Sequence, residues 1–151
     1  MSDDAIITNR QARRDYFILE VFEAGIELKG SEIKSIRQRL ANLKDGFARI
    51  EKGEVFLYNL HITPYEFARR DESEPKRARK LLLRKSEIKH LFAKVSEKSL
   101  TLIPLKIYFK NSFAKVELAV AKGKKLYDKR DSVKKRDAKL EIDRAMHGKR
   151  R

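Results

Sequence analysis

The sequence has no cysteine and no tryptophan, and only 3 prolines and 6 glycines in 151 residues. Without cysteine, the chain cannot form a disulfide framework, a thiolate zinc site or a cysteine nucleophile. It also lacks any apolar run near the roughly 18 residues that a membrane-spanning helix requires. The first residues, Met1-Ser2-Asp3-Asp4, are acidic and do not follow the basic-then-apolar plan of a signal peptide. These absences predict a cytoplasmic protein.

Acidic residues are outnumbered by basic ones. Lys and Arg number 37 against 22 Asp and Glu, which gives a net charge of +15. This surplus favours a polyanionic partner, because each phosphate that a cation neutralises releases counterions. A membrane surface is the weaker interpretation, since helices that lie on membranes place large apolar residues beside their basic face. The composition therefore predicts a nucleic-acid-binding protein with no membrane partner.

The positive charge is concentrated at the C-terminal end. Residues 122–151 contain 13 basic and 5 acidic residues and few large apolar ones. So little burial cannot offset the entropy cost of ordering a separate domain. We predict a folded unit over residues 1–121 and a basic tail over 122–151 that is disordered when free. A weak helical face in the tail, which would form mainly on a partner, consists of Ala138, Ile142, Ala145 and Met146.

Apolar residues that alternate with polar ones predict that the folded unit is mainly β. The run 15–22 is rich in aromatic and branched residues, as strands are. Glu23-Ala24-Gly25 then indicates a turn, and alternation resumes over residues 26–28. With the later segments, the pattern predicts about six short antiparallel strands.

Two turn signals and one irregularity mark the later strands. Lys52-Gly53 lies between two alternating segments and predicts a two-residue hairpin. Asn111-Ser112 indicates a second turn, and a change of parity near Pro104 predicts a bulge or bend. One face of the strand around Pro104 is expected to carry Ile103, Leu105, Ile107 and Phe109.

Two segments have helical rather than β periodicity. Over residues 31–40 the apolar positions recur at helical spacing, and Ser31 is expected to cap the first turn. Residues 86–98 form a clearer amphipathic helix, with Glu87 in its first turn and Lys94 near its end. The fold class predicted is a six-stranded antiparallel barrel, similar to an oligonucleotide-binding (OB) fold, with flanking helices and the basic tail.

Residues that could carry catalysis are few. The three histidines have no partner at metal-ligand spacing, and no Gly-rich phosphate loop or GxSxG motif is present. Asp71, Glu72 and Glu74 could hold a metal in a small nuclease, but Pro75 and the arginines around them favour a solvated loop. The sequence therefore predicts a protein that is not an enzyme, with no metal and no cofactor.

Three basic segments, 9–14, 76–85 and 122–130, are candidates for RNA contact. In the second, six cations surround the triplet Leu81-Leu82-Leu83, which cannot all face inward in a regular strand or helix. This pattern is compatible with two interpretations. The segment could be solvated, with its leucines in the core, or it could contact RNA. In the third, Tyr127 lies amid cations, an arrangement that single-stranded RNA binders use for stacking and phosphate contact. The candidate cations in the first two segments are Arg10, Arg13, Arg79 and Lys80.

Several motifs in one order resemble the SmpB family of bacterial SsrA-binding proteins. Residues 9–18, followed by Phe22-Glu23-Ala24-Gly25, resemble the N-terminal part of the family's sequences. The later motifs, which extend the resemblance over nearly the whole chain, are Gly30–Arg37, Ala41–Asp45, His61–Tyr65, Arg77–Leu83 and Lys122–Arg130.

This resemblance implies a six-stranded OB-like barrel and a role in the rescue of stalled ribosomes by trans-translation. The implied partners are transfer-messenger RNA (tmRNA) and the ribosome and, indirectly through tmRNA, elongation factor Tu and alanyl-tRNA synthetase. By resemblance, Asn9, Glu23, Leu82 and Lys115 lie where the family contacts the tRNA-like domain of tmRNA. The tail is implied to enter the decoding centre and the empty messenger channel as a helix. Its implied contact residues are Lys122, Gly123, Lys124, Lys125, Tyr127, Asp128, Lys129, Arg130, Ile142 and Met146.

Two other functions are compatible with parts of the pattern. A basic structural protein of the ribosome would also combine a barrel with a basic extension. A nuclease would use the carboxylates at 71, 72 and 74. The ordered set of family motifs favours the rescue factor over both.

Overall fold

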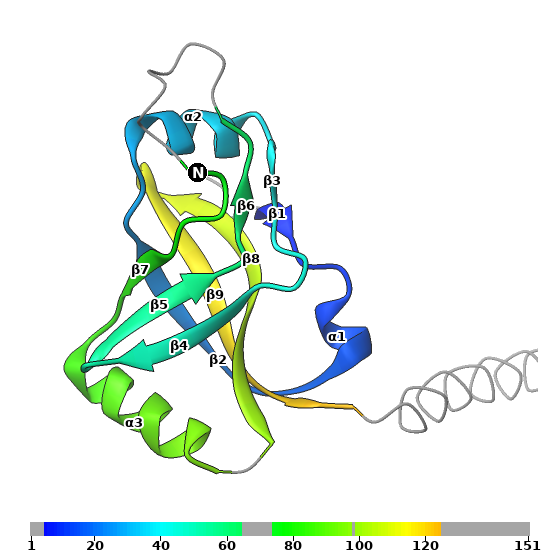
Figure 1. Cartoon of the computed structure of the whole chain (residues 1–151), viewed down its shortest axis with the longest axis vertical. Coiled ribbons are helices and arrows are strands. Elements are labelled where there is room, and N and C mark those ends of the chain that lie inside the picture. The colour runs from blue at the N-terminus through cyan, green and yellow to red at the C-terminus, as the bar shows by residue number, and fades with distance from the viewer. Residues whose placement is uncertain (1–4, 65–73, 98, 125–151) are drawn as a thin grey trace, which may run out of the picture.

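The computed structural model describes residues 5–64, 74–97 and 99–124, and Figure 1 shows a barrel of strands with helices at its ends and side. The helices are α1 (Ala12–Asp15), α2 (Gly30–Arg37) and α3 (Lys85–Val95). The strands are β1 (Ala5–Thr8), β2 (Tyr16–Ile26), β3 (Ala41–Asn42), β4 (Phe47–Glu51), β5 (Glu54–Tyr58), β6 (His61–Ile62), β7 (Arg79–Leu82), β8 (Leu100–Lys110) and β9 (Phe113–Gly123).

Six antiparallel strands close into a ring in the order β8-β4-β5-β7-β2-β9, and the pairing of β8 with β9 completes it. β1 adds to β8, and β3 pairs with β6 outside the ring. The predicted mainly β barrel is confirmed. Closure of the ring pairs the backbone groups that an open sheet would leave exposed at its edges.

The predicted hairpin at Lys52-Gly53 and the predicted turn at Asn111-Ser112 are both confirmed. Lys52 and Gly53 join β4 to β5 with φ values of 50° and 77°. Asn111 and Ser112 join β8 to β9 with φ values of 50° and 69°. Positive φ at both positions matches the twist of the flanking strands, and Gly and Asn adopt it at low cost.

The turn predicted at Glu23-Ala24-Gly25 is wrong, because β2 continues through it to Ile26. Gly25 pairs with Lys115 of β9 on one side and with Leu82 of β7 on the other. A Cβ at Gly25 would lie 3.2 Å from the Leu82 Cβ. The glycine therefore allows close approach of two strands and does not end the first.

The bulge predicted near Pro104 is confirmed, because the β8–β9 register shifts between Pro104 and Lys106. The predicted face is wrong. Ile107 belongs to the main core inside the barrel, whereas Ile103 and Leu105 pack outside it against Ala12 of α1. The bulge therefore exchanges the inner and outer faces of β8. Helix α1, which the sequence pattern did not predict, covers the outer face at Ile103 and Leu105.

The two predicted helices are present, with shorter bounds. Ser31 is not a cap, because it lies buried inside α2, which follows Lys29. The side chain of Glu32 instead accepts a hydrogen bond from the Lys29 backbone N–H at 2.8 Å. In α3, Leu91 is fully buried against the barrel, while Phe92 is 59% exposed. Of the helices within the described ranges, none is both long and apolar enough to cross a membrane.

The barrel extends slightly beyond the predicted boundary at residue 121. Lys122 and Gly123 are the last residues of β9, where Gly123 pairs with Tyr16, and the Lys124 N–H donates to the Asp15 carbonyl at 2.9 Å. These residues therefore belong to the barrel. The other residues predicted for the tail contacts, Lys125, Tyr127, Asp128, Lys129, Arg130, Ile142 and Met146, lie outside the described residues.

Candidate nucleic-acid interface

Three neighbouring strands bring predicted RNA contacts together on the outside of the barrel. Leu82 of β7, Gly25 of β2 and Lys115 of β9 lie side by side, because Gly25 is the register partner of both others. Glu23 lies two residues before Gly25 and therefore on the same face of β2. These residues, with Leu83, Arg84 and Glu87, line a hollow of about 590 Å³. We call this the β7–β2–β9 surface.

Leu82 presents apolar surface to solvent in this hollow. Its side chain is 47% exposed, whereas Leu81 beside it is only 1% exposed and belongs to the main core. The prediction that the leucine triplet cannot all face inward is confirmed. An exposed leucine flanked by Lys115 and Arg84 can pack on a base or sugar while the cations meet phosphates.

Glu23 is held in an ionised state by its neighbours. The Tyr108 hydroxyl donates to Glu23 Oε2 at 2.5 Å, and Lys110 Nζ lies 3.6 Å from the same oxygen. The hydrogen bond from Tyr108, more than the nearby charges of Lys110 and Lys115, lowers the pKa of Glu23 below its ordinary value. The carboxylate is thus an oriented acceptor for base amino or ribose hydroxyl groups.

Replacing Tyr108 with phenylalanine is expected to raise the pKa of Glu23 toward that of an ordinary glutamate, because the largest lowering contribution is removed. Carbon-detected NMR titration of the side-chain carboxyl group measures the change. Lys80→Ala is the matched control: Lys80 makes its ion pair with Glu54 of β5, at 3.0 Å, and is not among the groups that shift the pKa of Glu23, so this pKa should not move. An unchanged Glu23 titration in Tyr108→Phe would show that the hydroxyl does not orient this carboxylate.

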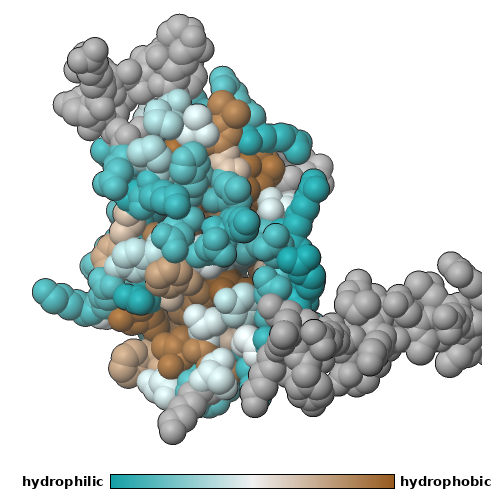
Figure 2. Space-filling view, turned by 45° about the vertical axis from the view of Figure 1, so that its right-hand side comes forward, coloured by the Kyte–Doolittle hydropathy of each residue, from teal (hydrophilic) through white to brown (hydrophobic). Residues whose placement is uncertain are grey.

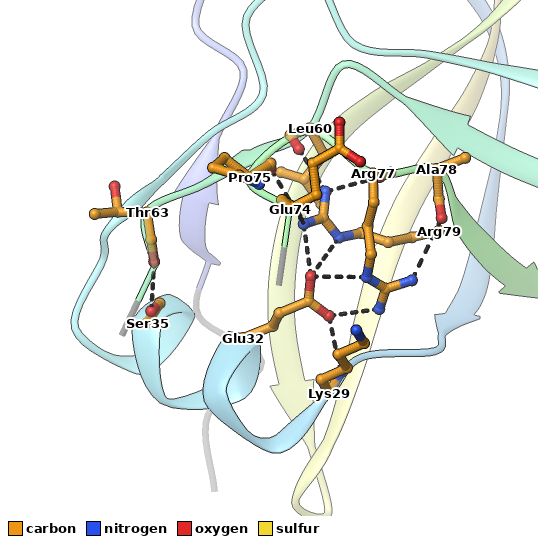
Figure 3. A network of polar contacts seen from close by, with 10 residues as sticks. All are labelled: Lys29, Glu32, Ser35, Leu60, Thr63, Glu74, Pro75, Arg77, Ala78 and Arg79. Atoms are coloured by element: carbon orange, nitrogen blue, oxygen red, sulfur yellow. Dashed lines mark hydrogen bonds and ion pairs between the residues drawn. The ribbon is translucent and has the colours of Figure 1, made fainter. Parts of the chain in front are cut away.

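The structure corrects the assignment of Arg79 as an RNA contact. Arg79 is 0% exposed, and its guanidinium donates to Glu32 Oε2 at 2.6 and 3.0 Å and to the carbonyl of Leu60 at 2.5 Å (Figure 3). Arg77 binds the same carboxylate. Arg79 therefore has no donor directed at solvent and instead ties β7 to α2.

Lys80, next along the strand, points outward and forms an ion pair with Glu54 of β5 at 3.0 Å. Asn9 lies at the junction of β1 and α1, where its amide donates to the Pro104 carbonyl at 3.0 Å. Arg10 and Arg13 are exposed beside it. Glu23, Leu82 and Lys115 are thus brought into one hollow, whereas Asn9 lines two other hollows.

Sequence reasoning missed Tyr108 and Gly25 as parts of this region, and it included Arg84 only as one of the cations of the candidate segment 76–85. Tyr108 is an aromatic residue between Lys106 and Lys110 in an alternating strand, and its parity could have placed it with them on the outer face. Gly25 was interpreted as a turn, and only its two strand partners show its role.

Catalytic or metal chemistry has no candidate centre in the part of the chain that the structure describes. No group of three metal-ligating side chains occurs among those residues. His90 lies 2.7 Å from Glu20 on the barrel exterior. Of the predicted nuclease carboxylates, Asp71 and Glu72 lie outside the described ranges, and Glu74 is exposed.

A closed six-stranded antiparallel barrel, with hydrophilic residues over much of the face that Figure 2 shows, belongs to the class of OB-like barrels. The comparison with protein families is more specific. The family described as "SmpB protein" matches residues 6–148 of this chain. The chain belongs to the SmpB family.

Relatives from several bacteria match nearly the full chain. An SsrA-binding protein of Desulforudis audaxviator is 59% identical over 97% of this chain and 96% of the relative. An SsrA-binding protein of Caldicellulosiruptor saccharolyticus is 62% identical over 93% of this chain and 89% of the relative. A solved structure described as "tmRNA-SmpB: a journey to the center of the bacterial ribosome" is 50% identical, covers 83% of this chain and 92% of its own, and has a TM-score of 0.69.

Proposed function

We propose that this protein binds the tRNA-like domain of tmRNA and delivers it to the A site of stalled ribosomes for trans-translation. The observation that carries the proposal is membership of the SmpB family, supported by full-length relatives that are SsrA-binding proteins. A related solved structure that combines SmpB with tmRNA and the ribosome supports the same assignment. The protein acts by binding and positioning RNA and is not an enzyme.

The β7–β2–β9 surface is the proposed docking site for the tRNA-like domain. Lys115 and Arg84 supply phosphate contacts, Leu82 packs on an exposed base or sugar, and Glu23 accepts hydrogen bonds. Asn9, Arg10 and Arg13, at the start of α1, are proposed to extend the contact. Strand pairing fixes the backbone of Glu23, Leu82 and Lys115, so at these positions only the side chains remain to be ordered on binding.

The proposed division of labour places the ribosomal contacts in the tail. Residues after Lys124 are proposed to be disordered in the free protein and to fold as a helix in the decoding centre and the empty messenger channel. Tyr127 supplies a stacking ring among Lys125, Lys129 and Arg130, while Ile142 and Met146 share the distal helical face. Elongation factor Tu and alanyl-tRNA synthetase are proposed partners through tmRNA only.

Two substitutions test the docking surface. Lys115→Ala is expected to reduce the slope of log affinity against log salt by about 0.9, because one phosphate contact is lost. Leu82→Ala should weaken binding by about 1 kcal/mol, roughly fivefold, without altering the slope. Filter binding with the isolated tRNA-like domain at several salt concentrations measures both effects.

Lys89→Ala is the matched control, since Lys89 is exposed on α3 and outside the lining of the hollow. It should leave affinity and slope close to those of the unaltered protein. Equal loss in Lys89→Ala and Lys115→Ala would mean that binding depends on total charge and not on this surface.

A further inference from the structure

A second hollow, of about 380 Å³, lies between α1 and the start of β4, away from the β7–β2–β9 surface. Tyr16 at the start of β2 lines it, nine residues from Gly25, which corresponds to roughly 30 Å along a strand. The two hollows therefore lie toward opposite ends of β2. We call this one the α1–β4 hollow, and its polar lining includes Gln11, Asp15, Asp45 and Thr101.

Phe47 and Arg49 line the α1–β4 hollow and belong to an aromatic and cationic platform, which Tyr58 extends beyond the lining. The rings of Phe47 and Tyr58 stack with centroids 5.4 Å apart and planes at 19°. The guanidinium of Arg49 lies 5.1 Å from the Phe47 ring and 5.9 Å from the Tyr58 ring. The Tyr58 hydroxyl donates to Glu51, which fixes the second ring in place. Such a platform offers flat π surface and positive charge, the combination on which unpaired bases stack.

A smaller hollow of about 170 Å³ adjoins the first and shares Asn9 and Gln11 with it. Arg10 and Lys44 line this second space, and both side chains are exposed. The Lys44 backbone N–H donates to Asn42 Oδ1 at 2.8 Å, which shapes the loop that carries the lysine. Two cations that line one small open space suit a phosphate group. We call this the Arg10–Lys44 hollow.

We propose that the two adjoining hollows form a site for a single unpaired RNA nucleotide, with its base in the α1–β4 hollow against Phe47 and Arg49 and its phosphate on Arg10 and Lys44. The proposal rests on the proposed function in that the ligand is RNA and Arg10 is one of the proposed docking residues, but it adds a base contact on Phe47 and Arg49, away from the β7–β2–β9 surface. An unpaired nucleotide is required, because only a base outside a helical stack can present its face to a platform.

The lining also predicts which bases are preferred. The carboxylates of Asp15 and Asp45 are acceptors in this hollow beside the polar side chains of Gln11 and Thr101, and Arg14 Nε lies 3.6 Å from Asp15 Oδ1. Adenine, cytosine and guanine carry exocyclic amino groups that can donate to such acceptors, whereas uracil has none. The site is therefore expected to favour these three bases over uracil.

The test uses the full-length protein and an unpaired RNA hexamer that contains one 2-aminopurine, whose fluorescence falls when it stacks. The unaltered protein is expected to quench the probe on binding. Phe47→Leu should weaken binding about 5- to 150-fold, the range for one lost base stack, and should abolish quenching. Arg49→Met, which keeps the volume of the side chain, should also weaken it. Lys44→Ala should reduce the salt slope by about 0.7, the single-strand value.

Phe113→Leu is the matched control, because Phe113 is 69% exposed at the β8–β9 turn and lines neither hollow. Circular dichroism melts of each variant separate loss of binding from loss of folding. The proposal is overturned if the unaltered protein does not quench the probe. It is also overturned if folded Phe47→Leu binds like the unaltered protein, or if Phe113→Leu loses as much affinity.

The outcome is separable from that of the proposed function. Lys115→Ala should bind the hexamer normally while showing its salt defect with the tRNA-like domain. If Lys115→Ala abolishes hexamer binding and Phe47→Leu does not, the nucleotide site is wrong and the docking surface stands. If the unaltered protein binds the hexamer through Phe47 but does not bind the tRNA-like domain, the nucleotide site stands and the tmRNA assignment is wrong.

Discussion

Replacing Glu32 with alanine is expected to lower the free energy of unfolding by about 3–5 kcal/mol, the cost of removing one partner from a buried ion pair. Glu32 is 1% exposed and accepts hydrogen bonds from Arg77, from Arg79 and from the Lys29 backbone N–H. Without it, the guanidinium of Arg79 stays buried with carbonyl acceptors only. Since small domains have about 5–15 kcal/mol of stability, the variant should be close to unfolding. Urea denaturation followed by circular dichroism measures the loss.

The control is Glu54→Ala, which removes an exposed ion pair with Lys80 and should cost no more than about 1 kcal/mol. The double variant Glu32→Met/Arg79→Met should recover part of the loss, because both buried charges are removed together and none is left without a partner. Equal effects of Glu32→Ala and Glu54→Ala would show that the network at α2 contributes no more than a surface pair.

The same carboxylate makes stability depend on pH. Burial raises the pKa of Glu32, but hydrogen bonds from Arg77, Lys29 and Arg79 together outweigh it, and the pKa lies below the ordinary value of 4.5. A lowered native pKa means that this contribution is fully present above the unfolded-state pKa and is lost as pH falls through the native one. The urea midpoint should therefore fall on acidification below about pH 4.5, and less in the double variant.

Ending the chain after Lys124 is expected to preserve affinity for the tRNA-like domain while abolishing peptide tagging on stalled ribosomes. Lys124 is the proper end point, because β9 runs to Gly123 and the Lys124 N–H bonds to Asp15. A truncation after residue 121 would remove barrel pairing as well as the tail. The proposed RNA-docking residues Glu23, Leu82 and Lys115 remain in the shortened protein.

Within the tail, Tyr127→Ala is expected to slow single-round peptidyl transfer to alanyl-tmRNA by about 5- to 150-fold, if one base stack of about 1–3 kcal/mol forms in the rate-limiting step. Ile142→Ala/Met146→Ala should also slow transfer through loss of the distal helical face. RNA affinity is measured in parallel and should not change. Unaltered transfer in both variants, or a loss fully explained by weaker RNA binding, would contradict the division of labour.

Local sequence determined the features that depend on neighbouring residues alone. Strand alternation predicted the antiparallel barrel, and Lys52-Gly53 and Asn111-Ser112 predicted their hairpins, because turn conformation is set by two residues. The leucine triplet predicted an exposed leucine, because successive side chains on a strand point to opposite faces.

Tertiary structure decided what depends on residues distant in sequence. Arg79 lies among cations that suggested RNA contact, yet Glu32, 47 residues earlier, draws its guanidinium inside. Glycine is typical of turns, and the sequence pattern therefore indicated a turn at Gly25. The closeness of Leu82 shows instead that β2 and β7 approach each other at this glycine. The Phe47–Tyr58–Arg49 platform and the α1–β4 hollow arise from strand pairing and from the packing of α1. A one-dimensional pattern specifies which face a residue takes in its own element, but which partner meets that face depends on how the barrel closes.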